Sequence, residues 1–222
     1  MSMLSGLKGI RSIVSSQIAV HCTGGIMTKL KTGLHFPELL DKMGIHSLDA
    51  YTDRKAGWLD RLYNQALRLY PAPLDEYAAS PVDRRIKFMY GVLYELDQLN
   101  TATLDAMHEM FGIACMDSFK HIARIARAGH LVAADGAEIY LPHLDRLALP
   151  ITFIHGEKND TFLPVSTQHT LEALKAANDP DGSKGLYHRH VIPGYGHIDC
   201  IFGKNAVRDV FPHILTHLEA NA

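Results

Sequence analysis

Leu149 to Gly203 is the stretch that decides the fold: it opens with LPITFIHGEKNDTFLPVSTQ, continues as a helical run and closes with LYHRHVIPGYGHIDCIFG. Two apolar runs in it, 150–155 and 186–192, have the length and composition of buried strands. Each is followed by a polar loop that contains glycine. Because ligands and reacting groups gather beyond the carboxyl ends of strands in an open α/β sheet, we expect the functional site in these two loops.

The two loops carry a carboxylate and a histidine. Asp160 follows the first strand, where an aspartate can orient a histidine tautomer and stabilise the imidazolium. His197 lies in Gly-Tyr-Gly-His, and an imidazole in an exposed loop exchanges protons near neutral pH. We therefore predict His197 as a general base and Asp160 as its orienting acid. Glu157 and Asp199 are alternative acids, and an aspartate just before Pro164 also suits a helix start.

The sequence around these loops indicates neither a metal ion nor a nucleotide cofactor. His188 and His190 alternate on one strand face, but their spacing to Cys200 matches no zinc signature, so we predict no metal site. No G-x-G-x-x-G sequence occurs, and we expect no FAD or dinucleotide cofactor.

A nucleophile is the missing member of this set. The strand–nucleophile–helix elbow reads G-x-S-x-G, and the chain contains no such pentapeptide. Cys22 follows the β-branched run 10–20, a predicted strand, and a thiolate paired with a histidine is a competent nucleophile. The helix after it would carry Lys29 and Lys31, whereas a helix behind an elbow is usually buried. We interpret Cys22 as an inert or pocket-lining thiol, with nucleophilic attack as the alternative.

Residues 24–148 read as one helix after another. Amphipathic runs are predicted at 58–70, after Pro81, at 102–111 and at 116–127. Their aromatic and methionine stripes are typical of core packing and, in a block inserted between strands, also of a substrate pocket. We predict an α/β core made of residues 1–23 and 149–222 and a helical cap made of residues 24–148. The order strand, helices, strand, helix, strand, helix implies parallel strands with helical crossovers.

Composition and charge argue against several classes of protein. The chain has 222 residues, 47% of them hydrophobic and 21% charged, and a formal net charge of −2, so no nucleic-acid partner is indicated. Its three cysteines have unrelated spacings, which argues against a disulfide framework and favours the cytoplasm. No apolar run approaches the ~20 residues of a membrane span, and the sequence from Met1 onward lacks the features of a signal peptide.

These residues carry a family resemblance. HGEKND…P and GYGHIDCIFGKNA resemble the acid and histidine loops of the α/β-hydrolase fold. GLKGIRSIVSSQIAVH, followed by helices, is similar to the segment that leads through the sixth strand into the cap. More narrowly, the chain resembles the α/β-hydrolase module found alone or fused to glucose-methanol-choline oxidoreductases of the cholesterol oxidase type. The resemblance spans nearly the whole chain, and IPGYGHIDCIFGKNA is its most specific part.

The resemblance implies a partial α/β-hydrolase fold: about three parallel strands of the family's eight, flanking helices and a large helical cap. It implies hydrolysis of an apolar ester or acyl substrate, with His197 as the base. The acid maps onto Asp160 or Glu157, because the family's G-x-x-D is one residue shorter than the distance from Gly156 to Asp160. An elbow similar to A-H-C-x-G-S would precede Met1. We therefore expect acid and base without a nucleophile, and a chain that is inactive alone.

The same resemblance predicts an open sheet edge. Without the elbow strand, the strand at 10–20 exposes unpaired backbone groups and an apolar face. We expect that strand to pair with an N-terminal half or with a second copy of the chain. Two alternatives stay open: a short hydrolase that uses Cys22, and a non-catalytic accessory domain of a cholesterol oxidase-like oxidoreductase.

Overall fold

The computed structural model describes residues 8–50, 65, 67 and 81–222. The helical run expected at 58–70 and the helix end expected at 1–7 lie outside this part, apart from Gln65 and Leu67. The strands are β1 (Ile13–Ser16), β2 (Ser47–Asp49), β3 (Ile113–Cys115), β4 (Ile151–Gly156) and β5 (Tyr187–Ile192). The helices before β4 are α2 (Ile26–Gly33), α3 (Phe36–Lys42), α5 (Pro81–Tyr90), η2 (Leu96–Gln98), α6 (Thr101–Asp105), α7 (Met107–Met110), α8 (Met116–Ala128) and η3 (Leu141–Leu147). Those after it are α9 (Val165–Asn178), α10 (Asp199–Phe202), α11 (Ala206–Asp209) and α12 (Phe211–Ala220).

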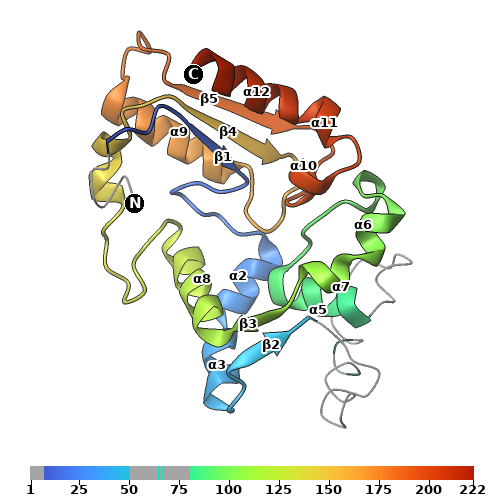
Figure 1. Cartoon of the computed structure of the whole chain (residues 1–222). Helices are drawn as coiled ribbons and strands as arrows, with labels where there is room; N and C mark the ends of the chain where they lie inside the picture. Colours follow the sequence, from blue (N-terminus) through green and yellow to red (C-terminus); the bar gives the residue numbers. More distant parts are fainter. Residues whose placement is uncertain (1–7, 51–64, 66, 68–80) are drawn as a thin grey trace.

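β1, β4 and β5 form a parallel sheet in the order β1-β4-β5 (Figure 1). Ile151 of β4 lies opposite Ile13 of β1 on one side and Tyr187 of β5 on the other. β4 is buried along its whole length, as expected for the central strand of a sheet covered on both faces. The predicted α/β fold, with parallel strands joined by helical crossovers, is confirmed.

Alternate residues of β4 enter different cores, because successive side chains of a strand point to opposite faces. Phe153 packs with Leu174 of α9, whereas Ile154 packs with Ile192 and with Val210 at the start of α12. Figure 1 accordingly shows α9 on one side of the sheet and α12 on the other. The two cores hold the carboxyl ends of β4 and β5 in a fixed relation, and both functional loops leave from those ends.

β1 is shorter than the strand expected at 10–20. It ends at Ser16, and the next residue, Gln17, is buried and has a φ of 63°. This left-handed conformation costs a non-glycine residue free energy and turns the chain out of the sheet. The strand therefore ends at a residue whose side chain faces into the protein.

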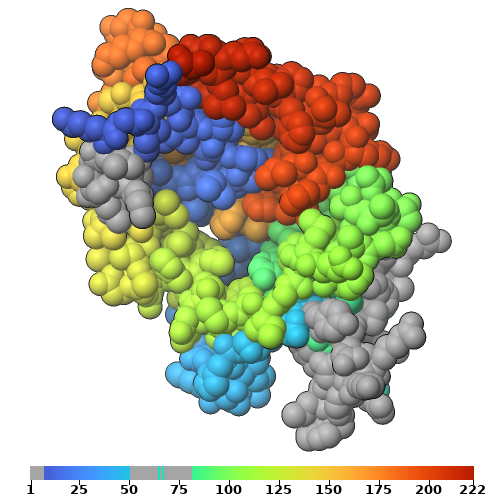
Figure 2. Space-filling model, viewed as in Figure 1, coloured from blue at the N-terminus to red at the C-terminus, as the bar shows by residue number. Residues whose placement is uncertain are grey.

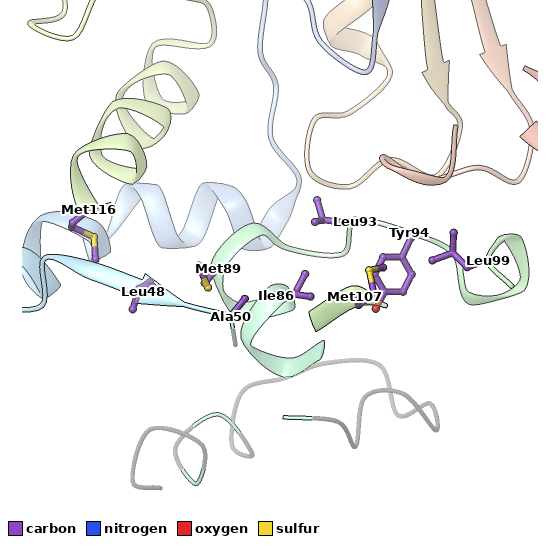
Figure 3. Packing of buried hydrophobic residues seen from close by; sticks show 9 residues of the cluster. All are labelled: Leu48, Ala50, Ile86, Met89, Leu93, Tyr94, Leu99, Met107 and Met116. Atoms are coloured by element: carbon purple, nitrogen blue, oxygen red, sulfur yellow. The ribbon is translucent and has the colours of Figure 1, made fainter. Parts of the chain in front are cut away.

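The helical block between β1 and β4 has its own core (Figure 3). β2 and β3 pair antiparallel in it, and α8 is followed by Gly129, a C-terminal cap with a φ of 78°. The buried members of this core come from β2, α5, α7, the start of α8 and the segments around them: Leu48, Ala50, Ile86, Met89, Leu93, Tyr94, Leu99, Met107 and Met116. Among the described residues, none of the helices combines the length and the apolar character that crossing a membrane requires.

Candidate functional site

The loops after β4 and β5 lie against each other. The N–H of Lys158 donates to the carbonyl of Tyr195 at 2.8 Å, and the N–H of Gly194 donates to Oε2 of Glu157 at 3.0 Å. A Cβ on Gly156 would overlap the carbonyl oxygens of Tyr195 and Gly196. Residue 156 must be glycine for this approach, and Glu157 uses its carboxylate to hold the two loops together.

His197 meets Asn159 and not a carboxylate. Nδ1 of His197 lies 3.0 Å from Nδ2 of Asn159, a residue that is 1% exposed. Oδ1 of Asn159 accepts from the backbone N–H groups of Thr161 and Phe162, both at 3.1 Å. Nδ2 also donates to Oε1 of Gln17 at 2.9 Å. The side chain that orients His197 is thus itself held at both ends.

Asp160 lies on another side of the same loop. Its carbonyl accepts from the N–H of Gly25 at 3.1 Å, and a Cβ on Gly25 would overlap its carboxylate. The expected contact between Asp160 and His197 is not formed in the described part of the chain. The two backbone hydrogen bonds to Asn159 turn residue 159 inward, and residue 160 then faces the start of α2. The G-x-x-D spacing, counted from Gly156, falls on Asn159, and this signal could have found it.

Asp199, the other alternative acid, is fully buried and joins the histidine loop to the helical block. Its Oδ2 accepts from the N–H of Gly196 at 2.9 Å and from the N–H of Glu95 at 3.2 Å. Burial raises the pKa of this carboxyl group. The backbone N–H of His197 donates to the carbonyl of Leu93 at 2.9 Å, a second link between the same segments. Asp199 therefore positions the loop without contacting the imidazole.

Burial, and to a smaller extent the charge of His155, lowers the pKa of His197 to about 4. A carboxylate within about 4–6 Å would act in the opposite direction, because it favours the charged imidazolium. The electrostatics and the hydrogen bonds thus agree that the described surroundings supply His197 with no acidic partner. At neutral pH this histidine is uncharged.

His197 lines a cavity of about 260 Å³ between the functional loops and the helical block. Its walls are mostly apolar and come from α2, α3, α5 and α8 as well as from the loop after β4; they include Phe36, Phe88, Met116 and Phe162. Figure 2 shows this face hollowed between the sheet-bearing part and the helices below it. A concave, mainly apolar site with a few polar groups is the usual form of a small-molecule pocket.

Lys31 of α2 lines the same cavity. Its Nζ donates to the carbonyl of Phe88 at 3.0 Å. Burial lowers its pKa to about 8, and the negative charge of Asp160 opposes that change. The pocket therefore holds an amine that loses its proton more easily than an exposed lysine but is still mostly charged at neutral pH.

Cys22 has the surroundings of an inert thiol. It is buried, and its Sγ lies 3.6 Å from the carbonyl oxygen of Ala19 and 3.9 Å from that of Val20. Burial raises its pKa to about 11, so the thiol stays protonated at neutral pH, whereas attack requires the thiolate.

His190 stacks on His213 of α12, with ring centroids 4.1 Å apart. Among the described residues, no group of three or more His, Cys, Asp or Glu side chains is placed to hold a metal ion.

Comparison with known proteins gives a distant structural likeness. No protein-family model matches the sequence, and no curated protein matches it. Among solved structures, the chain is similar to the crystal structure of esterase E22, with a TM-score of 0.45 and 13% sequence identity. The match covers 98% of this chain and 56% of the esterase, so the chain spans little more than half of that structure's length.

Proposed function

We propose that the chain supplies the cap and the histidine loop of an α/β-hydrolase-type protein, and that its pocket receives a small apolar ester-like molecule without hydrolysing it. One observation carries the proposal: His197, at the carboxyl end of β5, lines an apolar cavity walled by the inserted helices. This is the place in an open α/β sheet where ligands bind. The mainly apolar walls match an apolar acyl chain.

Hydrolysis by the chain alone would need a nucleophile beside His197. In the part of the chain that the structure describes, the ring of His197 hydrogen-bonds only to Asn159 and to no hydroxyl or thiol. The alternative that uses Cys22 requires a thiolate, which burial opposes. An accessory role beside a cholesterol oxidase-like oxidoreductase keeps the pocket but adds no chemistry to it, and no contact in the structure favours it.

Turnover of p-nitrophenyl butyrate tests the absence of hydrolysis. We expect the same rate for the wild type and for His197→Ala, because other histidines contribute equally to background hydrolysis in both proteins. Turnover in the wild type that is lost in His197→Ala would overturn the proposal.

Binding of methyl hexanoate, followed by NMR shifts of the protein's methyl groups, tests the pocket itself. Ile122 lines the pocket and is 41% exposed, so Ile122→Trp should obstruct the cavity without entering the core and should weaken binding at least about tenfold. Ile201→Trp is the matched control, because Ile201 is 50% exposed on α10 and does not line the cavity. Equal binding by both variants would show that the molecule binds elsewhere.

A further inference from the structure

Backbone N–H groups, which can only donate hydrogen bonds, fix the orientation of the Asn159 amide. The N–H groups of Thr161 and Phe162 must face an acceptor, so the amide oxygen lies toward them. The N–H of Gly156 donates to the Gln17 side chain at 3.0 Å, which makes that atom Oε1. The Asn159 atom 2.9 Å from Gln17 Oε1 must then be the donor, Nδ2. The NH₂ group of Asn159 therefore also faces His197.

A ring nitrogen that faces an NH₂ group must carry a lone pair, so Nδ1 of His197 accepts and the ring proton resides on Nε2. We infer that Asn159 holds His197 as the Nε2–H tautomer, which makes His197 a hydrogen-bond donor to the acyl oxygen of a ligand and not a general base. The ligand part of this inference rests on the proposed function; the tautomer part does not.

Reversing the amide would break the network that holds it. The NH₂ group would then face the two N–H groups of Thr161 and Phe162, and Oδ1 would face Oε1 of Gln17. Gln17 is fixed in turn by the hydrogen bond from Gly156, on a left-handed backbone that only its surroundings can maintain. The donor side of Asn159 is therefore locked toward the imidazole.

This tautomer is the wrong one for base catalysis. A general base in a triad keeps its Nδ1 protonated against the acid and takes the nucleophile's proton on Nε2. An aspartate-to-asparagine change at the acid position of a serine protease leaves the geometry intact and lowers kcat about 10⁴-fold for this reason. The imidazolium form is also opposed, because its second proton would point at the Asn159 NH₂ group. Even a nucleophile brought to the pocket would find no base in His197.

The hydroxyl groups of the cavity do not decide the ligand class, because Thr32 and Thr161 use their protons within the protein and the hydroxyls of Thr28 and Tyr90 can donate or accept. The hydroxyl of Thr32 donates to the carbonyl of Thr28 at 2.8 Å, and that of Thr161 donates to the carbonyl of Val92 at 3.4 Å. Lys31 contributes an amine whose Nζ donates to the carbonyl of Phe88, and no carboxylate is among the described side chains that line the cavity. The matching ligand is an apolar molecule with an acyl oxygen, which an ester and a carboxylate both provide.

The first experiment needs no ligand. Long-range proton–nitrogen correlation NMR of protein with isotope-labelled histidine reports which ring nitrogen is protonated, and His197→Asn identifies the signals of residue 197. We expect a protonated Nε2 and an unprotonated Nδ1 at neutral pH. In Asn159→Asp, the carboxylate should accept from Nδ1 and reverse the pattern. A protonated Nδ1 in the wild type would overturn the inference.

The second experiment tests the ligand class with three probes of similar length: methyl hexanoate, hexanoate and hexylammonium. Methyl hexanoate and hexanoate should shift the Nε2–H signal of His197, and hexylammonium, which has only donors, should bind at least about tenfold more weakly. A stronger effect of hexanoate than of the ester would assign a carboxylate ligand, and the reverse an ester. Tighter binding of hexylammonium would overturn the acceptor selection.

The results separate the two proposals. An Nε2–H tautomer with no binding of any probe would refute the pocket proposed above and the ligand part of the inference, and would leave the tautomer in place. Binding of methyl hexanoate to a protein with a protonated Nδ1 would support the pocket and refute the inference.

Discussion

The Nδ1 atom of His197 lies 3.0 Å from the amide nitrogen of Asn159, while the neighbouring Asp160 turns its carboxylate toward Gly25. The residue that contacts His197 is thus a neutral asparagine, and the charged aspartate is its neighbour in the chain. Two adjacent side chains that face different surroundings provide a direct test of what sets the pKa of His197.

Asn159→Asp should raise the pKa of His197 from about 4 by about 1–3 pH units, because a carboxylate in contact favours the imidazolium. Asp160→Asn is the matched control: it changes the charge at the next residue, which has no hydrogen bond to the imidazole, and should leave the pKa of His197 within about half a pH unit. NMR titration of the His197 ring measures both. A larger change in Asp160→Asn than in Asn159→Asp would contradict the placement of the two side chains.

The lowered pKa of His197 makes the free energy of unfolding depend on pH. The ordinary pKa of histidine is about 6.5, and the folded value is about 4. Between these values the unfolded chain binds a proton that the folded chain does not, so stability falls as the pH drops through this window and levels off below it. The contribution of His197 is on the order of 3 kcal/mol.

Urea unfolding at a series of pH values measures this dependence in the wild type and in His197→Asn. The variant keeps an acceptor for Asn159 but cannot titrate, so its free energy of unfolding should fall less steeply between about pH 6.5 and 4. Burial lowers the pKa of His155 and His217 as well, and these residues should leave part of the slope in both proteins. Identical slopes would show that His197 is not shielded from solvent in the folded state.

Gly156→Ala should destabilise the protein by at least about 3 kcal/mol, because the added methyl group would meet two carbonyl oxygens that other hydrogen bonds hold in place. Gly33→Ala is the control: nothing lies near its added Cβ, and a helix favours alanine over glycine by up to about 1 kcal/mol. Thermal unfolding compares the two variants. Equal melting temperatures would mean that the loops after β4 and β5 do not touch.

β1 pairs with β4 on one side, and in the described ranges no strand pairs with its other side. The N–H groups of Ile13 and Gln17 donate hydrogen bonds on the β4 side. Because the backbone N–H groups of successive strand residues point to opposite sides, the N–H of Ser16 faces the open edge. We propose that this edge pairs with a second copy of the chain. Ser16→Pro should then reduce association, measured by light scattering during gel filtration, because proline removes the free donor.

Ser16→Ala is the control for that experiment, since it keeps the N–H group. Association that persists unchanged in Ser16→Pro would place the contact elsewhere. A monomer in all three proteins would argue against pairing through β1 at the concentrations used.

Much of the core could be predicted from local sequence, because an apolar run between glycine-rich loops has few alternatives to a buried strand. β4, β5 and α8 begin and end within a few residues of the predicted positions. β1 is shorter than the strand predicted at 10–20, since nothing in its composition indicates that Gln17 adopts a left-handed backbone. The helix predicted after Pro81 ends at Tyr90, before Gly91, which has a φ of 95°.

The amino-acid sequence by itself determined that a histidine and a set of polar side chains would leave the ends of two neighbouring parallel strands, because strand periodicity and glycine position are local properties. Which of those side chains meets His197 was decided only by the tertiary structure. The choice depends on Gln17, which is 142 residues away from Asn159 along the chain, and on two backbone N–H groups that fix the amide. A hydrogen-bond network joins atoms by their positions in space, and these positions exist only once the sheet has brought the carboxyl ends of β1, β4 and β5 together.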